Sequence, residues 1–198
     1  MTRRSAPLKI DSATGLLSDA RQVLSPHLDA RPAGMAPELL VVHGISLPPG
    51  EFGGPWIDRL FTGTLPAEAH PYFREIAATR VSAHALIRRA GEIVQYVPFG
   101  ERAWHAGISQ YRGRPGCNDF SVGVELEGTG DTPYTDAQYQ RLAALAAALL
   151  ATYDSLGAEH IVGHSDIAPG RKDDPWPTFD WPRFRALLKE RYVPLARS

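Results

Sequence analysis

LLVVHG, residues 39–44, joins four consecutive apolar residues to a histidine and a glycine. A short apolar run that ends in two β-branched residues is typical of a buried strand, and this strand would present His43 at its C-terminal end. A second short run, HIVG at residues 160–163, leads into His164 in the same way. Because open sheets place their ligand sites beyond the carboxyl ends of strands, we expect both histidines to lie at a functional site.

The other patterned segments predict the rest of a sheet and the helices that cover it. Residues 81–97 divide at an Ala-Gly pair into the two strands of a hairpin, and residues 120–126, FSVGVEL, alternate as a further strand. The clearest helix spans residues 135–157 and begins with a capping box of Thr135 and Gln138. Shorter helices are expected at residues 56–61 and after Asp180. This order predicts an α/β fold, a single domain whose central mixed β-sheet is flanked by α-helices.

The length of 198 residues fits one domain with a sizeable core. Residues 1–36 are polar and weakly patterned, so we predict an N-terminal arm packed on the domain. Residues 37–192 would form the catalytic domain, and residues 193–198 a C-terminal tail.

Residues 46–71 form a long stretch that is rich in Gly and Pro but also contains aromatic residues, namely Phe52, Trp56 and Phe61. Long loops with their own aromatic residues often cover binding sites. Two interpretations stay open. The segment could close over a ligand as a lid, or its aromatic residues could be permanently packed core.

The composition is that of a soluble globular protein, with 43% hydrophobic and 22% charged residues. Lys and Arg total 21 against 22 Asp and Glu, a net charge of −1, which gives no electrostatic basis for a nucleic-acid or membrane partner. Cys117 is the sole cysteine, which fits a reducing compartment. The N-terminal residues lack the apolar segment of a secretory signal, so we expect a cytoplasmic protein. The oligomeric state is left open, with a monomer favoured.

The segment VGHSDIAPGRKDDPWP, residues 162–177, supplies carboxylates next to His164; they belong to Asp166, Asp173 and Asp174. Two histidines and a carboxylate are a usual catalytic zinc set that leaves a fourth position for water. Asp174 precedes a proline, which favours an extended backbone and a fixed carboxylate. In an extended loop Lys172 would project to the same side, where it could stabilise an oxyanion. Spacing alone favours zinc only slightly over a solvated polar loop whose charges pair with one another.

Five collinear segments are more specific than this metal pattern. They are VVHGISLPPGEFGGPWIDRLFTGT (41–64), RVSAHALIRRAGEIVQYVPFGERAWHAGIS (80–109), CNDFSVGVELEGT (117–129), YTDAQY (134–139) and GHSDIAPGRKDDP (163–175). On these segments, which span nearly the whole chain, the sequence resembles the bacterial zinc N-acetylmuramoyl-L-alanine amidases of peptidoglycan recycling. That family is related to the peptidoglycan recognition proteins.

The resemblance implies zinc as the cofactor and assigns the metal ligands to His43, His164 and Asp174. It implies Glu125 as the catalytic carboxylate and Lys172 as the catalytic lysine. The alternation of residues 120–126 supports Glu125, because Val122, Val124 and Leu126 share one face and Glu125 points to the other. Glu127 is expected to be a solvent-facing strand residue.

The resemblance also implies the substrate and the residues along its groove. These residues are Arg80, Trp104, His105 and Arg114. From the local sequence, Trp104 could equally be a core residue and Arg80 a surface charge. The implied reaction is hydrolysis of the amide bond between N-acetylmuramic acid, in its 1,6-anhydro form, and L-alanine. A muropeptide would thus be the small-molecule substrate, and no organic cofactor is needed.

Three positions depart from the family pattern. Gly44 stands where relatives usually carry Asn, Gly116 where they can offer Arg, and Trp176 where Gly is usual. Two rival functions remain open: a peptidoglycan-recognition module without catalysis, and a zinc peptidase or deacetylase that shares only the metal chemistry. No HExxH motif favours the second.

Overall fold

The computed structural model describes residues 7–192, and its centre is a six-stranded mixed sheet. In spatial order the strands are β1 (Arg21–Gln22), β5 (Ile93–Gln95), β4 (Ala85–Ile87), β9 (Ser121–Glu127), β3 (Leu39–Ile45) and β10 (Ile161–Gly163). Only β4 and β5, the predicted hairpin, pair antiparallel; the other neighbours in this sheet are parallel. Two small antiparallel sheets pair β2 (Leu28–Asp29) with β6 (Arg102–Ala103) and β7 (Gln110–Tyr111) with β8 (Arg114–Pro115).

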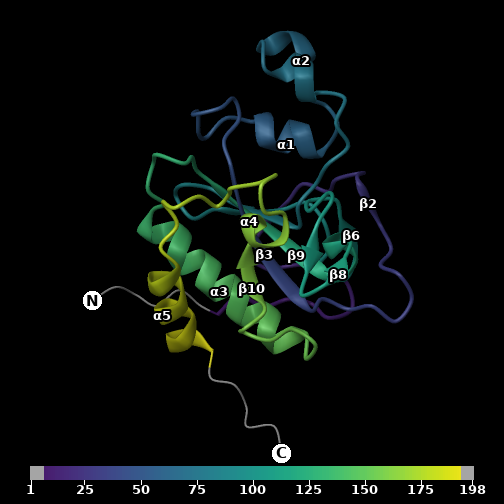
Figure 1. The fold of residues 1–198 in the computed structure, drawn as a ribbon, viewed down its shortest axis with the longest axis vertical. Coiled ribbons are helices and arrows are strands. Elements are labelled where there is room, and N and C mark those ends of the chain that lie inside the picture. The colour runs from purple at the N-terminus through teal and green to yellow at the C-terminus, as the bar shows by residue number, and fades with distance from the viewer. Residues whose placement is uncertain (1–6, 193–198) are drawn as a thin grey trace, which may run out of the picture.

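Helices lie on both sides of the sheet, as the sequence predicts (Figure 1). The two long ones, α3 (Asp136–Thr152) and α5 (Trp181–Arg191), pack side by side. The short ones are α1 (Trp56–Phe61), α2 (Phe73–Ile76) and α4 (His164–Ile167), with 3-10 turns at Ala67–Ala69 and Cys117–Asp119. Within residues 7–192, no helix combines the length and apolar character that crossing a membrane requires.

The alternation of β9 sorts the sheet into two faces. Val122, Val124 and Leu126 are fully buried in the core cluster that α3 and α5 complete. The residues that alternate with them, including Glu125 and Glu127, therefore point to the opposite face, where α1 and the loops lie. The predicted assignment of Glu125 to the non-core face of this strand is confirmed.

The long helix begins as predicted but ends earlier. The Thr135 side chain accepts from the Gln138 N–H while the Gln138 side chain accepts from the Thr135 N–H, which is the capping box. The helix stops at Thr152, not at residue 157. Ser155 donates to the Pro37 carbonyl, and this contact turns the chain back toward the sheet.

The N-terminal segment is more than an arm laid over the domain. Leu8 and Leu17 are buried in the main core, and β1 forms an edge of the sheet by pairing with β5. Residues 7–36 are therefore an integral part of the fold. Residues 1–6 and the predicted tail, residues 193–198, lie outside the described residues.

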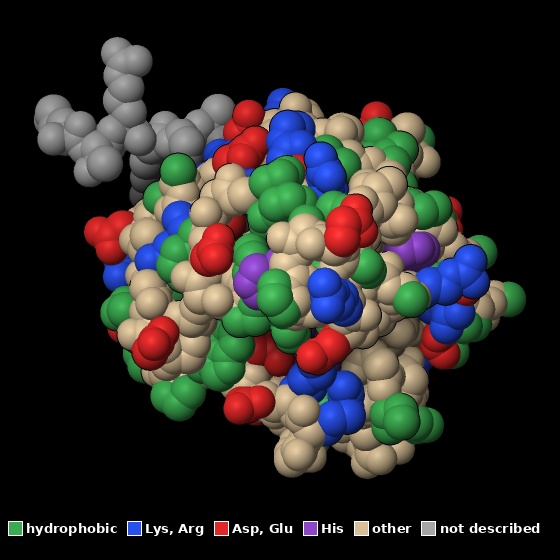
Figure 2. Space-filling model, turned by 90° about the horizontal axis from the view of Figure 1, so that it is seen from above, with side chains coloured by type: hydrophobic (Ala, Val, Ile, Leu, Met, Phe, Trp, Pro, Cys, Tyr) green, Lys and Arg blue, Asp and Glu red, His purple; other side chains and the backbone are tan. Residues whose placement is uncertain are grey.

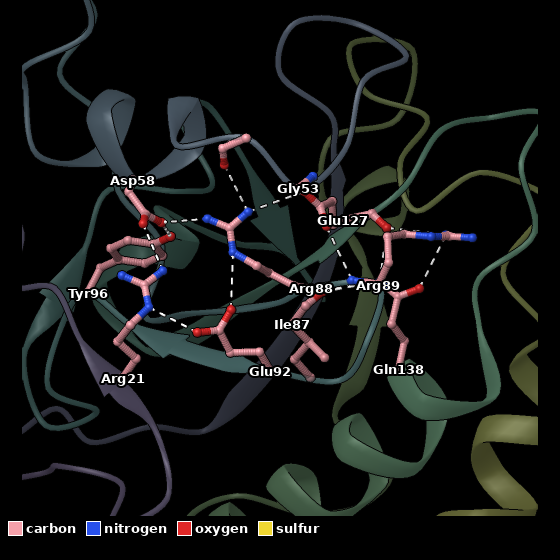
Figure 3. Close-up of polar contacts among 11 residues, drawn as sticks. Arg21, Gly53, Asp58, Ile87, Arg88, Arg89, Glu92, Tyr96, Glu127 and Gln138 are labelled. Atoms are coloured by element: carbon pink, nitrogen blue, oxygen red, sulfur yellow. Dashed lines mark hydrogen bonds and ion pairs between the residues drawn. The ribbon is translucent and has the colours of Figure 1, made fainter.

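The segment of residues 46–71 packs on the face of the sheet opposite α3. Ile57, Leu60 and Phe61 are buried in a second hydrophobic cluster. A polar network also ties the segment to the sheet (Figure 3). Arg88 reaches Asp58 of α1 on one side and Glu127 of β9 on the other. This arrangement supports the packed-core interpretation over the lid.

Glu127 corrects an expectation from the sequence. Its side chain is not solvent-facing, because the residue is only 1% exposed. The carboxylate accepts from the backbone N–H groups of Gly53 (2.6 Å) and Arg89 (3.2 Å) and contacts Arg88 (3.4 Å). These partners come from a distant loop and a neighbouring strand end, which local sequence does not reveal.

Candidate metal centre

Two histidines from neighbouring strand ends and one aspartate from a loop converge on one point. Val42 of β3 is paired with Gly163 of β10, so the residues that follow them, His43 and His164, are brought side by side. Their Nδ1 atoms lie 3.0 Å apart. The Asp174 carboxylate lies 3.3 Å from Nδ1 of His43 and 3.2 Å from Nδ1 of His164. The side chains are buried, and the three potential ligand atoms all lie within 4.8 Å of one another.

The surroundings of these three residues fit a zinc ion. Each imidazole has a partner for its far nitrogen: His43 Nε2 lies 2.8 Å from Nδ1 of His105, and His164 Nε2 lies 3.4 Å from the Ala106 carbonyl. Both Nδ1 lone pairs are thereby directed to the common point, as metal-bound histidines require. Two neutral imidazoles and a carboxylate match the ligand preference of zinc.

The charges at the site favour the same assignment. Burial lowers the pKa of His43 to about 4, so its imidazole is neutral at physiological pH. Burial alone would raise the pKa of Asp174, but hydrogen bonds with His164 and His43 lower it well below its usual range. The site therefore offers the negative charge of Asp174 and the neutral imidazole of His43 to a cation.

The structure separates the three candidate carboxylates of the loop after His164. Asp166 accepts the Gly163 N–H at 2.7 Å and so caps α4. Asp173 is exposed. Asp174 alone reaches the histidines, and its carboxylate is held by the Gly44 N–H at 3.3 Å.

Lys172 directly follows a turn at residues 169–171. The backbone N–H groups of Arg171 and Lys172 both donate to the Ala168 carbonyl. The Lys172 residue is exposed, whereas Asp174 is buried. The Lys172 charge still acts on the site, because it lowers the pKa of both His43 and Glu125.

Glu125 lies beside the ligand set as an incompletely bonded carboxylate. In the register of β3 and β9 it is the direct partner of His43. Its Oε2 atom is buried and has no hydrogen-bond partner among the described residues. Burial, and then the charge of Asp174, raises the pKa of Glu125 well above its usual range. A carboxylate in this position could take and return a proton beside a metal ion held by the three candidate ligands.

His105 lies against His43, one of the three candidate metal ligands. Besides its contact with His43, its Nε2 lies 3.0 Å from the Ser121 hydroxyl. The ring lies against Gly123, where an added Cβ would come within 3.0 Å of it. His105 thus fixes the orientation of His43. A glycine in the middle of a strand is the sequence signal that could have indicated this close approach.

The other expected groove residues are dispersed. Trp104 donates from Nε1 to Asp29 at 3.0 Å and stacks on His27, with ring centroids 5.9 Å apart. Arg80 is exposed. Arg114 is paired with Glu38 at 2.7 Å, at the end of β3 away from His43. The ion pair with Glu38 thus holds the Arg114 guanidinium away from the candidate metal centre.

Comparisons with known proteins agree with this site. Residues 33–177 match the family model of the N-acetylmuramoyl-L-alanine amidases. The chain is 66% identical to the 1,6-anhydro-N-acetylmuramyl-L-alanine amidase AmpD of Salmonella typhimurium (strain SL1344), over 88% of this chain and 92% of that protein.

Solved structures show the same likeness. A crystal structure of an AmpD selenomethionine derivative superposes with a TM-score of 0.87 and 64% identity, over 90% of this chain and 98% of that one. The amidase AmiD from E. coli, in complex with the substrate anhydro-N-acetylmuramic acid-L-Ala-D-gamma-Glu-L-Lys, superposes with a TM-score of 0.56 and 30% identity. That superposition covers 91% of this chain and 65% of the AmiD chain.

Proposed function

This chain belongs to the N-acetylmuramoyl-L-alanine amidase family, and we propose that it is a zinc enzyme of peptidoglycan recycling that acts on anhydro-muropeptides. It would hydrolyse the amide bond between 1,6-anhydro-N-acetylmuramic acid and L-alanine. The observation that carries the proposal is the convergence of His43, His164 and Asp174 beside the unpartnered Oε2 of Glu125. The names of the relatives, and the ligand bound in the AmiD structure, support the choice of substrate.

The residues divide the chemistry between them. His43, His164 and Asp174 would hold the zinc ion, which when bound polarises the scissile carbonyl and lowers the pKa of water toward ~7. Glu125 would accept the proton of the attacking water and deliver it to the departing alanine nitrogen. Lys172 would stabilise the negative charge on the carbonyl oxygen, a contribution of about 3 kcal/mol.

Substrate recognition and location belong to the proposal as well. A muropeptide stem carries free carboxylates, and the exposed guanidinium of Arg80 is available to pair with them. The face shown in Figure 2 mixes acidic and basic side chains without a broad region of one sign, which fits recognition by a few local charges. A cytoplasmic location, expected from the sequence, would match a recycled substrate, and cell fractionation would test it.

Zinc content and activity test the assignment together. Ala substitutions at His43, His164 or Asp174 should each abolish stoichiometric zinc, measured by atomic emission, and amidase activity. Glu125→Ala should retain zinc and lose kcat by roughly two to four decades. Full zinc occupancy in His164→Ala would remove that residue from the ligand set, and zinc loss in Glu125→Ala would make Glu125 a ligand instead of a base.

The choice of substrate separates the rival functions. Mass spectrometry should show release of the intact stem from an anhydro-muramyl tripeptide. Binding without cleavage would indicate a recognition module. Cleavage of the plain stem peptide at equal rate would indicate a zinc peptidase. Equal turnover of intact murein would remove the preference for anhydro-muropeptides.

A further inference from the structure

Trp176, two residues after the proposed ligand Asp174, has an unusual backbone conformation. Its φ of 62° lies in the left-handed region, where glycine is the favoured residue and a bulky side chain is rare. The turn is held by two backbone hydrogen bonds, from the Trp176 N–H to Asp173 and from the Phe179 N–H to Trp176. A tryptophan persists in such a conformation only where its surroundings hold it there.

Two glycines face the indole ring and a third faces the neighbouring Tyr134 ring. We call the three, Gly44, Gly130 and Gly128, the glycine cradle. A Cβ at Gly44 would come within 3.0 Å of both the Trp176 ring and the Tyr134 hydroxyl. A Cβ at Gly130 would lie 3.3 Å from the other edge of the indole ring, and one at Gly128 would collide with the Tyr134 ring. The two aromatic rings therefore fill space that side chains at these positions would otherwise occupy.

The rings in the cradle hold the loop that carries Asp174. The Tyr134 hydroxyl donates to the Pro175 carbonyl at 3.2 Å, so Pro175 is fixed between a hydrogen bond on one side and Trp176 on the other. Gly44, which the indole ring covers, donates its N–H to the Asp174 carboxylate. A movement of the ring would therefore shift both the loop and the donor that orients the ligand.

We propose that Trp176, seated in the glycine cradle, is a positioning residue for the metal ligand Asp174. Gly44 and Trp176 are then interdependent, because a side chain at residue 44 and the indole ring exclude each other. This inference rests on the proposed zinc site, but it concerns residues that touch neither the metal ligands' nitrogen atoms nor the catalytic carboxylate.

Zinc affinity of Trp176→Gly tests the inference. Glycine tolerates the left-handed backbone, so this variant removes the ring without adding backbone strain. We expect zinc binding, measured by chelator competition, to weaken by about 10- to 100-fold, as for other residues that orient a ligand. The visible spectrum of the Co²⁺-substituted protein should change as well. Trp56→Ala is the matched control. It removes a partly buried tryptophan that packs on Phe73, and it should lower Tm without changing zinc affinity.

A double-mutant cycle shows whether Trp176 acts through Asp174. In an Asp174→Ala background, where zinc or Co²⁺ binding is weaker, Trp176→Gly should have no further effect on the dissociation constant. If Trp176→Gly weakened metal binding by the same factor with and without Asp174, the ring would merely stabilise the fold. That result would overturn the inference. Unchanged zinc affinity in Trp176→Gly alone would overturn it too.

The glycine supplies the reciprocal test. Gly44→Ala should weaken zinc binding, because its methyl group collides with the indole ring. Gly44→Ala/Trp176→Gly should recover part of this loss of zinc affinity, since the indole ring is gone and the methyl group then meets the Tyr134 hydroxyl alone. Absence of this recovery would contradict the interdependence. A wild-type protein without stoichiometric zinc would instead overturn the proposed function, and this inference with it.

Discussion

Replacing Glu125 by Gln should stabilise the metal-free protein, whereas the same replacement at Glu127, two residues along the same strand and on the same face, should destabilise it. The two carboxylates differ in what surrounds them. Glu125 has a buried oxygen without a partner among the described residues, beside the negatively charged Asp174. Glu127 is almost completely buried, but it accepts two backbone N–H groups and contacts Arg88.

These contacts set the size of each effect. Burying a polar group without a partner costs about 1–3 kcal/mol, and more for a charged group. A neutral amide at residue 125 removes the negative charge that burial and Asp174 disfavour. A gain of about 1–2 kcal/mol would raise Tm by about 2–8 °C in a protein of this size. At Glu127 the amide keeps one acceptor oxygen but leaves Arg88 without its buried countercharge. Breaking such a pair costs about 3 kcal/mol or more, so Tm should fall by about 6 °C or more.

Thermal unfolding in EDTA at pH 7.5 measures both effects, and amidase activity of the zinc-loaded variants completes the comparison. Glu125→Gln should be more stable yet slower by roughly two to four decades, and Glu127→Gln less stable yet active. A fall in Tm for Glu125→Gln would refute the reasoning, because it would show that the carboxylate has a stabilising partner. An unchanged Tm for Glu127→Gln would show that the polar network does not hold residues 46–71.

Three further predictions follow from the same contacts. His105→Ala should weaken zinc binding about 10- to 100-fold, because the His43 imidazole loses the acceptor that orients it; unchanged affinity in chelator competition would contradict this. Burial lowers the pKa of His84 to about 3, so the unfolded chain alone gains a proton there as the pH falls below 6.5. The free energy of unfolding in EDTA should therefore be about 1.4 kcal/mol lower at pH 5.5 than at pH values well above 6.5 because of His84. Denaturant titrations of His84→Gln should show a pH dependence that is smaller by this amount. Hydrogen exchange of residues 46–71 should be the same with and without a bound muropeptide, and ligand-dependent protection would restore the lid interpretation.

The strands and the start of the long helix could be predicted from the sequence, because nearby residues determine them. The alternation of β9 sorts Val122 and Val124 from Glu125, and the capping box of Thr135 starts the long helix where expected. His43 and His164 could be paired in advance only by assuming that their strands are neighbours. The register of β3 and β10 brings the two histidines together in this way.

The interpretations that failed depend on contacts between distant segments. Glu127 looked solvent-facing because its partners, the N–H groups of Gly53 and Arg89, are separated from it by tens of residues. The contacts of the His105 ring with His43 and Ser121 could not be predicted either, because nothing near it in the sequence indicates them. Such partners become visible only when the sheet register is known.

The three proposed ligands differ in what fixes them, and the difference bears on how this site tolerates sequence change. His43 lies within β3 and His164 directly follows β10, which pairs with β3, so moving either one requires moving the sheet. Asp174 comes from a loop, and its position depends on rings packed against the glycine cradle. Two of the positions that depart from the family pattern, Gly44 and Trp176, are in contact there. A side chain at residue 44 and an indole at residue 176 cannot share that space, so Trp176 is tolerated only because residue 44 is glycine. Gly44 and Trp176 are therefore better understood as one change in packing that keeps Asp174 in place than as two separate losses of site residues.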